Sequence, residues 1–187
     1  MMKRITILLL ALAAFLALGG CSSKPNDAVN ANGTPNTPDG AAERFLNAVA
    51  HFDYDAANNE SVIDIGQLAK AGSGIKNYKK LLESQKETIP AQWKQQFGDD
   101  YRVDIKVLSL AKLSSSETQN ELTAFKTKYK AALDLPKLID FSKISEIASV
   151  KAVIAIAGSK AKTSNETTIY CAKYDGAWKI LDSPDFT

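Results

Sequence analysis

Asp175-Gly176 lies between two apolar segments near the C-terminus. Asp-Gly is typical of a two-residue hairpin turn, because both turn residues need a positive φ. The turn predicts two antiparallel strands and, with Tyr174 opposite Ala177, fixes their pairing. Cross-strand partners share a face, so four apolar side chains should lie together: Ile169, Cys171, Trp178 and Ile180. The same register places Ile169 opposite Asp182. The chain must therefore fold around an antiparallel hairpin with one strongly apolar face.

Hydrophobic spacing predicts helices upstream of this hairpin. Apolar residues recur at helical intervals over 41–58 and again over 75–98, where Pro90 should break or kink the helix and Gly98 should close it. Ser114 and Glu117 have the spacing of a capping box, which opens a third helix that Pro136 ends. Residues 138–147 are ambiguous between a turn and a short helix.

Further strands are predicted on both sides of the third helix. Alternating or β-branched residues indicate strands over 101–110, 150–157 and 167–174. Early helices followed by an antiparallel sheet make an α+β arrangement. We expect one such domain over residues 41–187.

The first 21 residues have the pattern of a secretory signal. Lys3 and Arg4 precede an apolar run that ends at Leu18, and this run is shorter than the roughly 20 residues that a membrane-spanning helix needs. Leu18-Gly19-Gly20-Cys21 resembles the lipobox of bacterial lipoproteins. That resemblance implies removal of residues 1–20 and attachment of lipid to the Cys21 thiol. Residues 21–40 contain three prolines and four asparagines, so they should form a flexible tether.

Charge and composition exclude several classes of protein. The 23 basic and 21 acidic residues balance once Lys3 and Arg4 are set aside, so nothing indicates a nucleic-acid partner. Two cysteines cannot form a disulfide-rich scaffold or a four-cysteine zinc site. We expect no metal and no cofactor.

Candidate reactive residues are few. His51 falls on the polar side of the first predicted helix, and Cys171 has apolar neighbours in the hairpin. A buried thiol in apolar surroundings has a raised pKa and is inert. Two acidic pairs lack the loop pattern of a calcium site, and Gly72-Ser73-Gly74 lacks the lysine of a phosphate-binding loop. The acidic pairs are Asp53 with Asp55 and Asp99 with Asp100. We assign no catalytic residue.

Two segments carry a resemblance to a known family. Phe-Leu-Asn-Ala-Val-Ala-His-Phe-Asp-Tyr-Asp-Ala-Ala at 45–57 and Tyr-Asp-Gly-Ala-Trp-Lys-Ile at 174–180 resemble the nuclear transport factor 2-like superfamily, and within it small lipoproteins of unknown function. The resemblance implies a cone, in which a curved antiparallel sheet wraps around the first helix. A cystatin-like sheet around one helix is the alternative. Enzymes of the superfamily often use an Asp, His or Tyr inside the cone.

The predicted interior contains almost no ionisable side chain. Six apolar residues should line it: Phe45, Val103, Ile105, Ile154, Ile169 and Trp178. We therefore expect a non-catalytic binding domain, held at the cell membrane or outer membrane by lipid, whose interior takes a small hydrophobic ligand or a part of an envelope protein. The alternative is a cone-shaped enzyme that acts on a small hydrophobic substrate.

Overall fold

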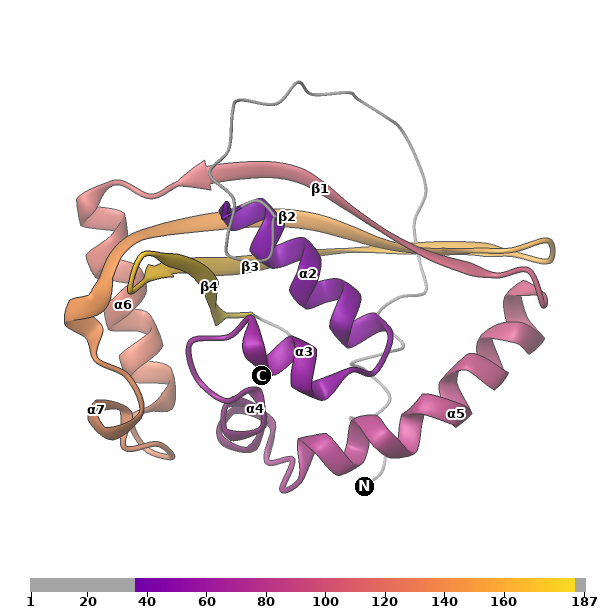
Figure 1. Cartoon of the computed structure of the whole chain (residues 1–187), viewed down its shortest axis with the longest axis horizontal. Helices are drawn as coiled ribbons and strands as arrows, with labels where there is room; N and C mark the ends of the chain where they lie inside the picture. Colours follow the sequence, from indigo (N-terminus) through magenta and orange to yellow (C-terminus); the bar gives the residue numbers. More distant parts are fainter. Residues whose placement is uncertain (1–35, 184–187) are drawn as a thin grey trace.

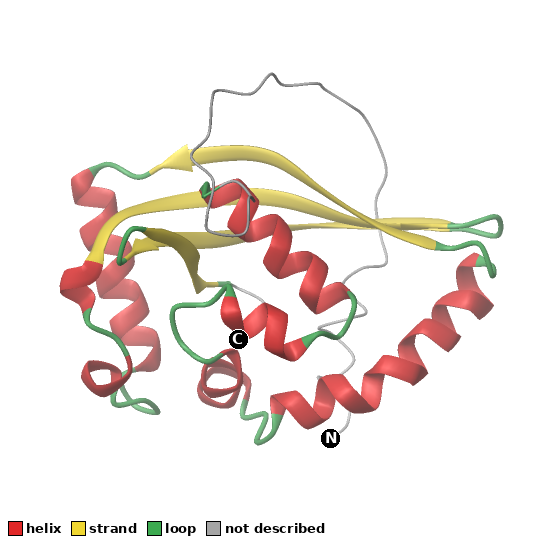
Figure 2. Ribbon diagram, viewed as in Figure 1, coloured by secondary structure: helices red, strands yellow, loops and turns green. Residues whose placement is uncertain are grey.

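The structure is a computed structural model that describes residues 36–183. The predicted signal segment, Cys21 and residues 22–35 lie outside the described residues. The domain is α+β, as predicted: helices pack against a four-stranded antiparallel sheet (Figures 1 and 2). The helices are α2 (Pro38–Ala50), α3 (Tyr54–Asn59), α4 (Ile65–Ser73), α5 (Tyr78–Phe97), α6 (Ser115–Tyr129) and the short α7 (Leu135–Leu138).

The sheet is a meander in which each strand pairs with the next one along the chain. Its strands are β1 (Arg102–Lys112), β2 (Ile144–Ala157), β3 (Lys162–Tyr174) and β4 (Ala177–Asp182), in the order β1-β2-β3-β4. β2 and β3 begin earlier than the sequence indicated, so they form a long hairpin that extends beyond α2. The sheet bends along its length but is not strongly curled (Figure 1).

The Asp175-Gly176 turn forms as predicted, with φ of 52° and 83°. Tyr174 pairs with Ala177, and Cys171 pairs with Ile180. Beyond Cys171 the expected register is wrong: Tyr170, not Ile169, faces Asp182. Leu181 is the extra residue on β4, and its side chain is fully buried. The irregularity therefore buries Leu181 and turns Asp182 onto the face that carries Tyr170.

Helix α2 packs on one face of the sheet and contacts all four strands. Thr37 caps its N-terminus, where the Thr37 hydroxyl accepts from the Gly40 amide, and Pro38 occupies the first turn, where a missing N–H costs nothing. The buried side of α2 includes Ala41, Ala42 and Phe45. These side chains pack toward the apolar face of the β3–β4 hairpin, which forms the centre of the core.

The first predicted helix is two helices. Phe52 has a φ of 59°, a left-handed conformation that interrupts the helix after His51. Asp53 then caps α3, because its carboxylate accepts from the Ala56 amide. Helical spacing continues across the break, so the periodicity alone did not reveal it.

The second helical region also differs from the prediction. It is preceded by α4, which ends at the left-handed Gly74, and α5 begins only at Tyr78 after the Asn77 cap. Helix α5 continues through Pro90, so the proline does not break the helix; the alternative expectation, a kink at Pro90, stays a prediction. No described helix is long and apolar enough to cross a membrane.

Helix α6 packs on the opposite face of the sheet, at the β3–β4 end. The predicted capping box is present: Ser114 and Glu117 each bond the other's backbone N–H. Side chains of β3 alternate between the faces, so Tyr170 lies opposite the face on which the Cys171 thiol reaches the Pro38 carbonyl oxygen of α2. The Tyr129 hydroxyl of α6 bonds Asp182, the partner of Tyr170. Both faces of this end of the sheet are therefore covered.

Candidate functional site

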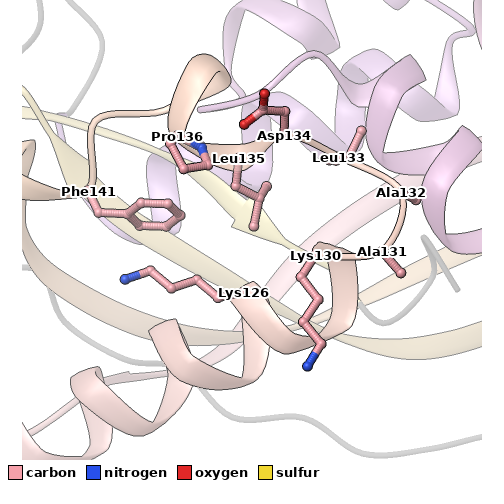
Figure 3. Close-up of a pocket in the computed structure, with 9 residues that line it drawn as sticks. All are labelled: Lys126, Lys130, Ala131, Ala132, Leu133, Asp134, Leu135, Pro136 and Phe141. Carbon is pink, nitrogen blue, oxygen red and sulfur yellow. The ribbon is translucent and has the colours of Figure 1, made fainter.

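A surface hollow of about 770 Å³ lies where α6 ends and the chain turns into α7 (Figure 3). Its floor is apolar and its rim carries charge. It is lined by Lys126, Lys130, Ala131, Ala132, Leu133, Asp134, Leu135, Pro136 and Phe141. Leu135 is buried, and Leu133 and Phe141 are partly buried. The hollow therefore offers a small apolar surface with amines beside it.

Lys126 and Phe141 lie on the same side of the hollow (Figure 3). The Lys126 amine is 4.2 Å from the centre of the Phe141 ring, a distance at which the ring face attracts a cation. Lys130 extends in another direction from the end of α6, as Figure 3 shows. Neither amine forms an ion pair with a carboxylate within residues 36–183. Asp134, which also lines the hollow, pairs with Lys137 at 2.6 Å.

Local sequence explains the shape of the hollow. Lys126 and Lys128 lie in the last turn of α6, where cations interact favourably with the carbonyl end of a helix. Leu135-Pro136 opens α7, and Pro136 suits this first turn because it has no N–H to leave unpaired. Between the two helices the backbone turns back at Tyr129, whose carbonyl oxygen accepts from the amides of Ala132 and Leu133.

Asp182 joins α6 to the end of β4. Its carboxylate accepts from the Lys128 amine at 2.9 and 3.1 Å, from the Tyr129 hydroxyl at 2.8 Å and from the Ser183 amide at 2.8 Å. The Asp182 side chain is 9% exposed, whereas that of Lys128 is 25% exposed. Every oxygen of this buried carboxylate is thus bonded, which makes it a structural anchor for the helix that carries Lys126.

The surroundings of Asp182 disfavour further negative charge. Burial raises the pKa of the Tyr129 phenol, and the Asp182 carboxylate raises it further. The pKa of Glu121 is also raised, first by burial and then by Asp182. Burial also raises the pKa of Tyr170, and the charges of Glu121 and then Asp182 raise it further. Tyr129 therefore stays protonated at neutral pH and serves as a hydrogen-bond donor to Asp182.

The six residues predicted to line an interior pocket do share one face of the sheet or pack against it. Phe45, Ile169 and Trp178 are buried in the core. Ile105 pairs with Ile154, and Val103 lies next to them; all three are partly buried. The hollow at α6 is lined by none of the six. Their role as ligand contacts stays a prediction.

Neither of the two candidate reactive residues, His51 and Cys171, lines the hollow. His51 is exposed at the end of α2, with Nδ1 2.8 Å from the Asn47 carbonyl oxygen. Cys171 is fully buried, and burial raises the pKa of its thiol well above the usual range. Both observations agree with the non-catalytic roles expected from the sequence: a histidine exposed to solvent and a thiol packed in the core.

Three residues of the acidic pairs and the glycine segment have structural roles. Asp53 caps α3, Asp55 pairs with Lys79 at 2.8 Å, and Asp100 accepts from the amide and hydroxyl of Ser159. Gly74 ends α4 in the left-handed conformation. Among residues 36–183, no group of three or more His, Cys, Asp or Glu side chains could hold a metal ion.

Sequence reasoning missed the hollow and the Asp182 network. The sequence analysis assigned residues 126–141 to a helix, the end of that helix and an ambiguous segment. Hydrophobic periodicity does not indicate that Lys126 and Phe141 lie close together across the turn between them. Asp182 was placed opposite Ile169, on the other face of the strand. One signal was present: Lys126, Lys128 and Lys130 form a basic cluster at a helix C-terminus.

Comparisons with known proteins found no match: no family model, curated protein or solved structure is similar to this chain.

The Asp182 network makes a direct prediction about stability. Asp182→Ala leaves the Lys128 amine and the buried Tyr129 hydroxyl without their acceptor, so the free energy of unfolding should fall by about 2–3 kcal/mol. Chemical denaturation at neutral pH measures this loss. Asp55→Ala, which removes an exposed carboxylate paired with Lys79, is the matched control and should cost much less. Equal losses in the two variants would mean that Asp182 does not anchor α6.

Proposed function

We propose that this chain is a lipid-anchored, extracytoplasmic binding domain without catalytic activity, and that the hollow at the end of α6 takes a small amphipathic anion. The observation that carries the ligand class is the Lys126 amine above the Phe141 ring, beside Leu133 and Leu135. An apolar tail can cover the leucines and the ring, while an anionic head replaces the weak ring contact of Lys126 with a charge-assisted hydrogen bond.

The lipid anchor rests on the N-terminal sequence. A basic start, an apolar run and the Leu18-Gly19-Gly20-Cys21 motif support export and lipid attachment at Cys21. Two or three acyl chains on one residue would hold the protein stably at the cell membrane or outer membrane. In that setting, the domain meets its ligand or an envelope partner outside the cytoplasm.

Membership of the nuclear transport factor 2-like superfamily is part of the same proposal. Its support is the contact of α2 with all four strands and the residue segments at 45–57 and 174–180. A cystatin-like arrangement also places one helix on an antiparallel sheet. A non-catalytic role is favoured over an enzyme because the reactive candidates of the described domain, His51 and Cys171, are exposed and inert respectively.

Lys126→Gln tests the proposed ligand. Decanoate and decanol serve as probes, because they share an apolar tail and differ in head charge. Lys126→Gln should weaken decanoate binding about tenfold, equal to roughly 1.4 kcal/mol, and should leave decanol binding nearly unchanged. Isothermal titration calorimetry on the chain from residue 22 onward, which needs no detergent, measures both affinities.

Two controls make this test selective. Lys80→Gln removes an exposed lysine of α5, far from the hollow in sequence, and should bind decanoate like the wild type. Phe141→Ala should weaken both probes, because it removes part of the apolar floor. Equal decanoate affinity in the wild type and Lys126→Gln would overturn the proposed role of this amine.

Cys21→Ser tests the anchor separately. Without the thiol there is no attachment point for diacylglycerol, so the variant should lose metabolic labelling by radioactive palmitate and remain an uncleaved precursor. The wild type should label and partition into the detergent phase of a two-phase extraction. A wild type that stays in the aqueous phase would contradict the lipoprotein assignment. That result would not bear on the proposed ligand binding in the hollow.

A further inference from the structure

The two edges of the sheet differ in how they are covered. The β4 edge is closed by the segment Glu60–Val62: the Ile180 amide donates to the Glu60 carbonyl oxygen at 2.7 Å, and the Val62 amide donates to Ile180 at 2.9 Å. On the other edge, β1 bonds to β2, and no other described residue makes a backbone hydrogen bond with residues 102–112. Figure 1 shows β1 along the outer side of the sheet. Within the part of the chain that the structure describes, this eleven-residue strand thus has one unpaired side.

This open edge also carries exposed apolar side chains. Leu108 and Leu110, which are 46% and 43% exposed, are the large hydrophobic residues of the described chain that are exposed to solvent. Both lie on β1. Val103, Ile105 and Val107 remain only partly buried, although α2 covers the face to which they belong. Free strands with exposed apolar residues readily pair with another strand.

The charges of β1 indicate what that other strand is. Arg102, Asp104 and Lys106 alternate in sign, lie on the face away from α2 and are exposed. Suppose that two copies of β1 run antiparallel about a twofold axis at Ile105. Asp104 of each copy then lies opposite Lys106 of the other, and Val103 lies opposite Val107. Each pair joins side chains of the same face, as the alternation of a strand requires.

Neighbouring registers are disfavoured. An axis at Asp104 would place Arg102 of one copy opposite Lys106 of the other. An axis at Lys106 would place the Lys106 side chains of the two copies opposite each other. Both arrangements are disfavoured, because like charges directly opposite one another are destabilising. An axis at Val103 leaves only residues 102–104 of the strand to pair, because β1 begins at Arg102. On the far side, the register shift between Val107 and Ser109 limits the regular segment.

We propose that β1 is a homodimer interface, in which Val103–Val107 pairs with the same segment of a second copy about Ile105 to make one continuous sheet of eight strands. Next to the paired segment, Leu108 of each copy lies opposite Arg102 at the start of β1 in the other, where it loses part of its exposure to solvent. The occupant of the free edge is therefore a second copy of this chain, selected by charge and register.

A charge exchange tests the register without disturbing the fold, because Asp104 and Lys106 are exposed. Sedimentation equilibrium of the full chain over a concentration series should show a dimer for the wild type. Asp104→Lys and Lys106→Asp should each reduce dimerisation at least tenfold by placing like charges opposite one another. The double variant should recover it. Glu166→Lys, which reverses an exposed charge on β3, is the control and should not affect the dimer.

Cross-linking gives a second readout that does not depend on affinity. Ile105→Cys should form a disulfide-linked dimer under mild oxidation, because residue 105 meets itself at the axis, while Thr168→Cys on β3 and the wild type should not. A wild type that is monomeric at every concentration would overturn the proposal. This holds even if the monomer binds a different protein along the β1 edge. Failure of the double charge variant to recover the dimer would overturn it equally.

Discussion

The packing of α2 on the β3–β4 hairpin is the contact on which the other elements depend. Phe45 and Ala41 of the helix are buried against a face that includes Ile169 and Ile180, and the thiol of Cys171 reaches the Pro38 carbonyl oxygen at the start of the helix. Burying a large apolar side chain contributes about 1.5–3 kcal/mol, so this layer supplies much of the stability. With one face covered in this way, α6 covers the opposite face, where the paired residues Ile147 and Ala172 are buried.

A second, polar contact decides where α6 lies. The irregularity at Leu181 turns Asp182 toward α6, and the carboxylate binds both Lys128 and Tyr129. Lys126 is on the same helix, so its place above Phe141 depends on a strand residue that lies far along the chain. Strand β1, through which the proposed dimer forms, lies at the opposite edge of the sheet from β4. The proposed ligand hollow and the proposed dimer edge therefore use separate surfaces.

The features that the sequence predicted well are those set by neighbouring residues. The Asp175-Gly176 turn and the Ser114–Glu117 capping box need only local chemistry, and both formed as expected. Prediction failed where tertiary contacts decide the outcome. The break at Phe52 preserves helical spacing, and Pro90 does not end α5. The hollow was missed because it joins Lys126 to Phe141 across a turn whose geometry no residue pattern records, and because an added residue on β4 reversed the expected face of Asp182.

A backbone amide NMR titration with decanoate distinguishes the proposed binding at the end of α6 from binding between α2 and the sheet. If the ligand binds at the end of α6, the largest chemical-shift changes should fall on Leu133, Leu135 and Phe141, with little change on β1 and β2. Changes centred on Val103, Ile105 and Ile154, the residues of the predicted interior pocket, would contradict it.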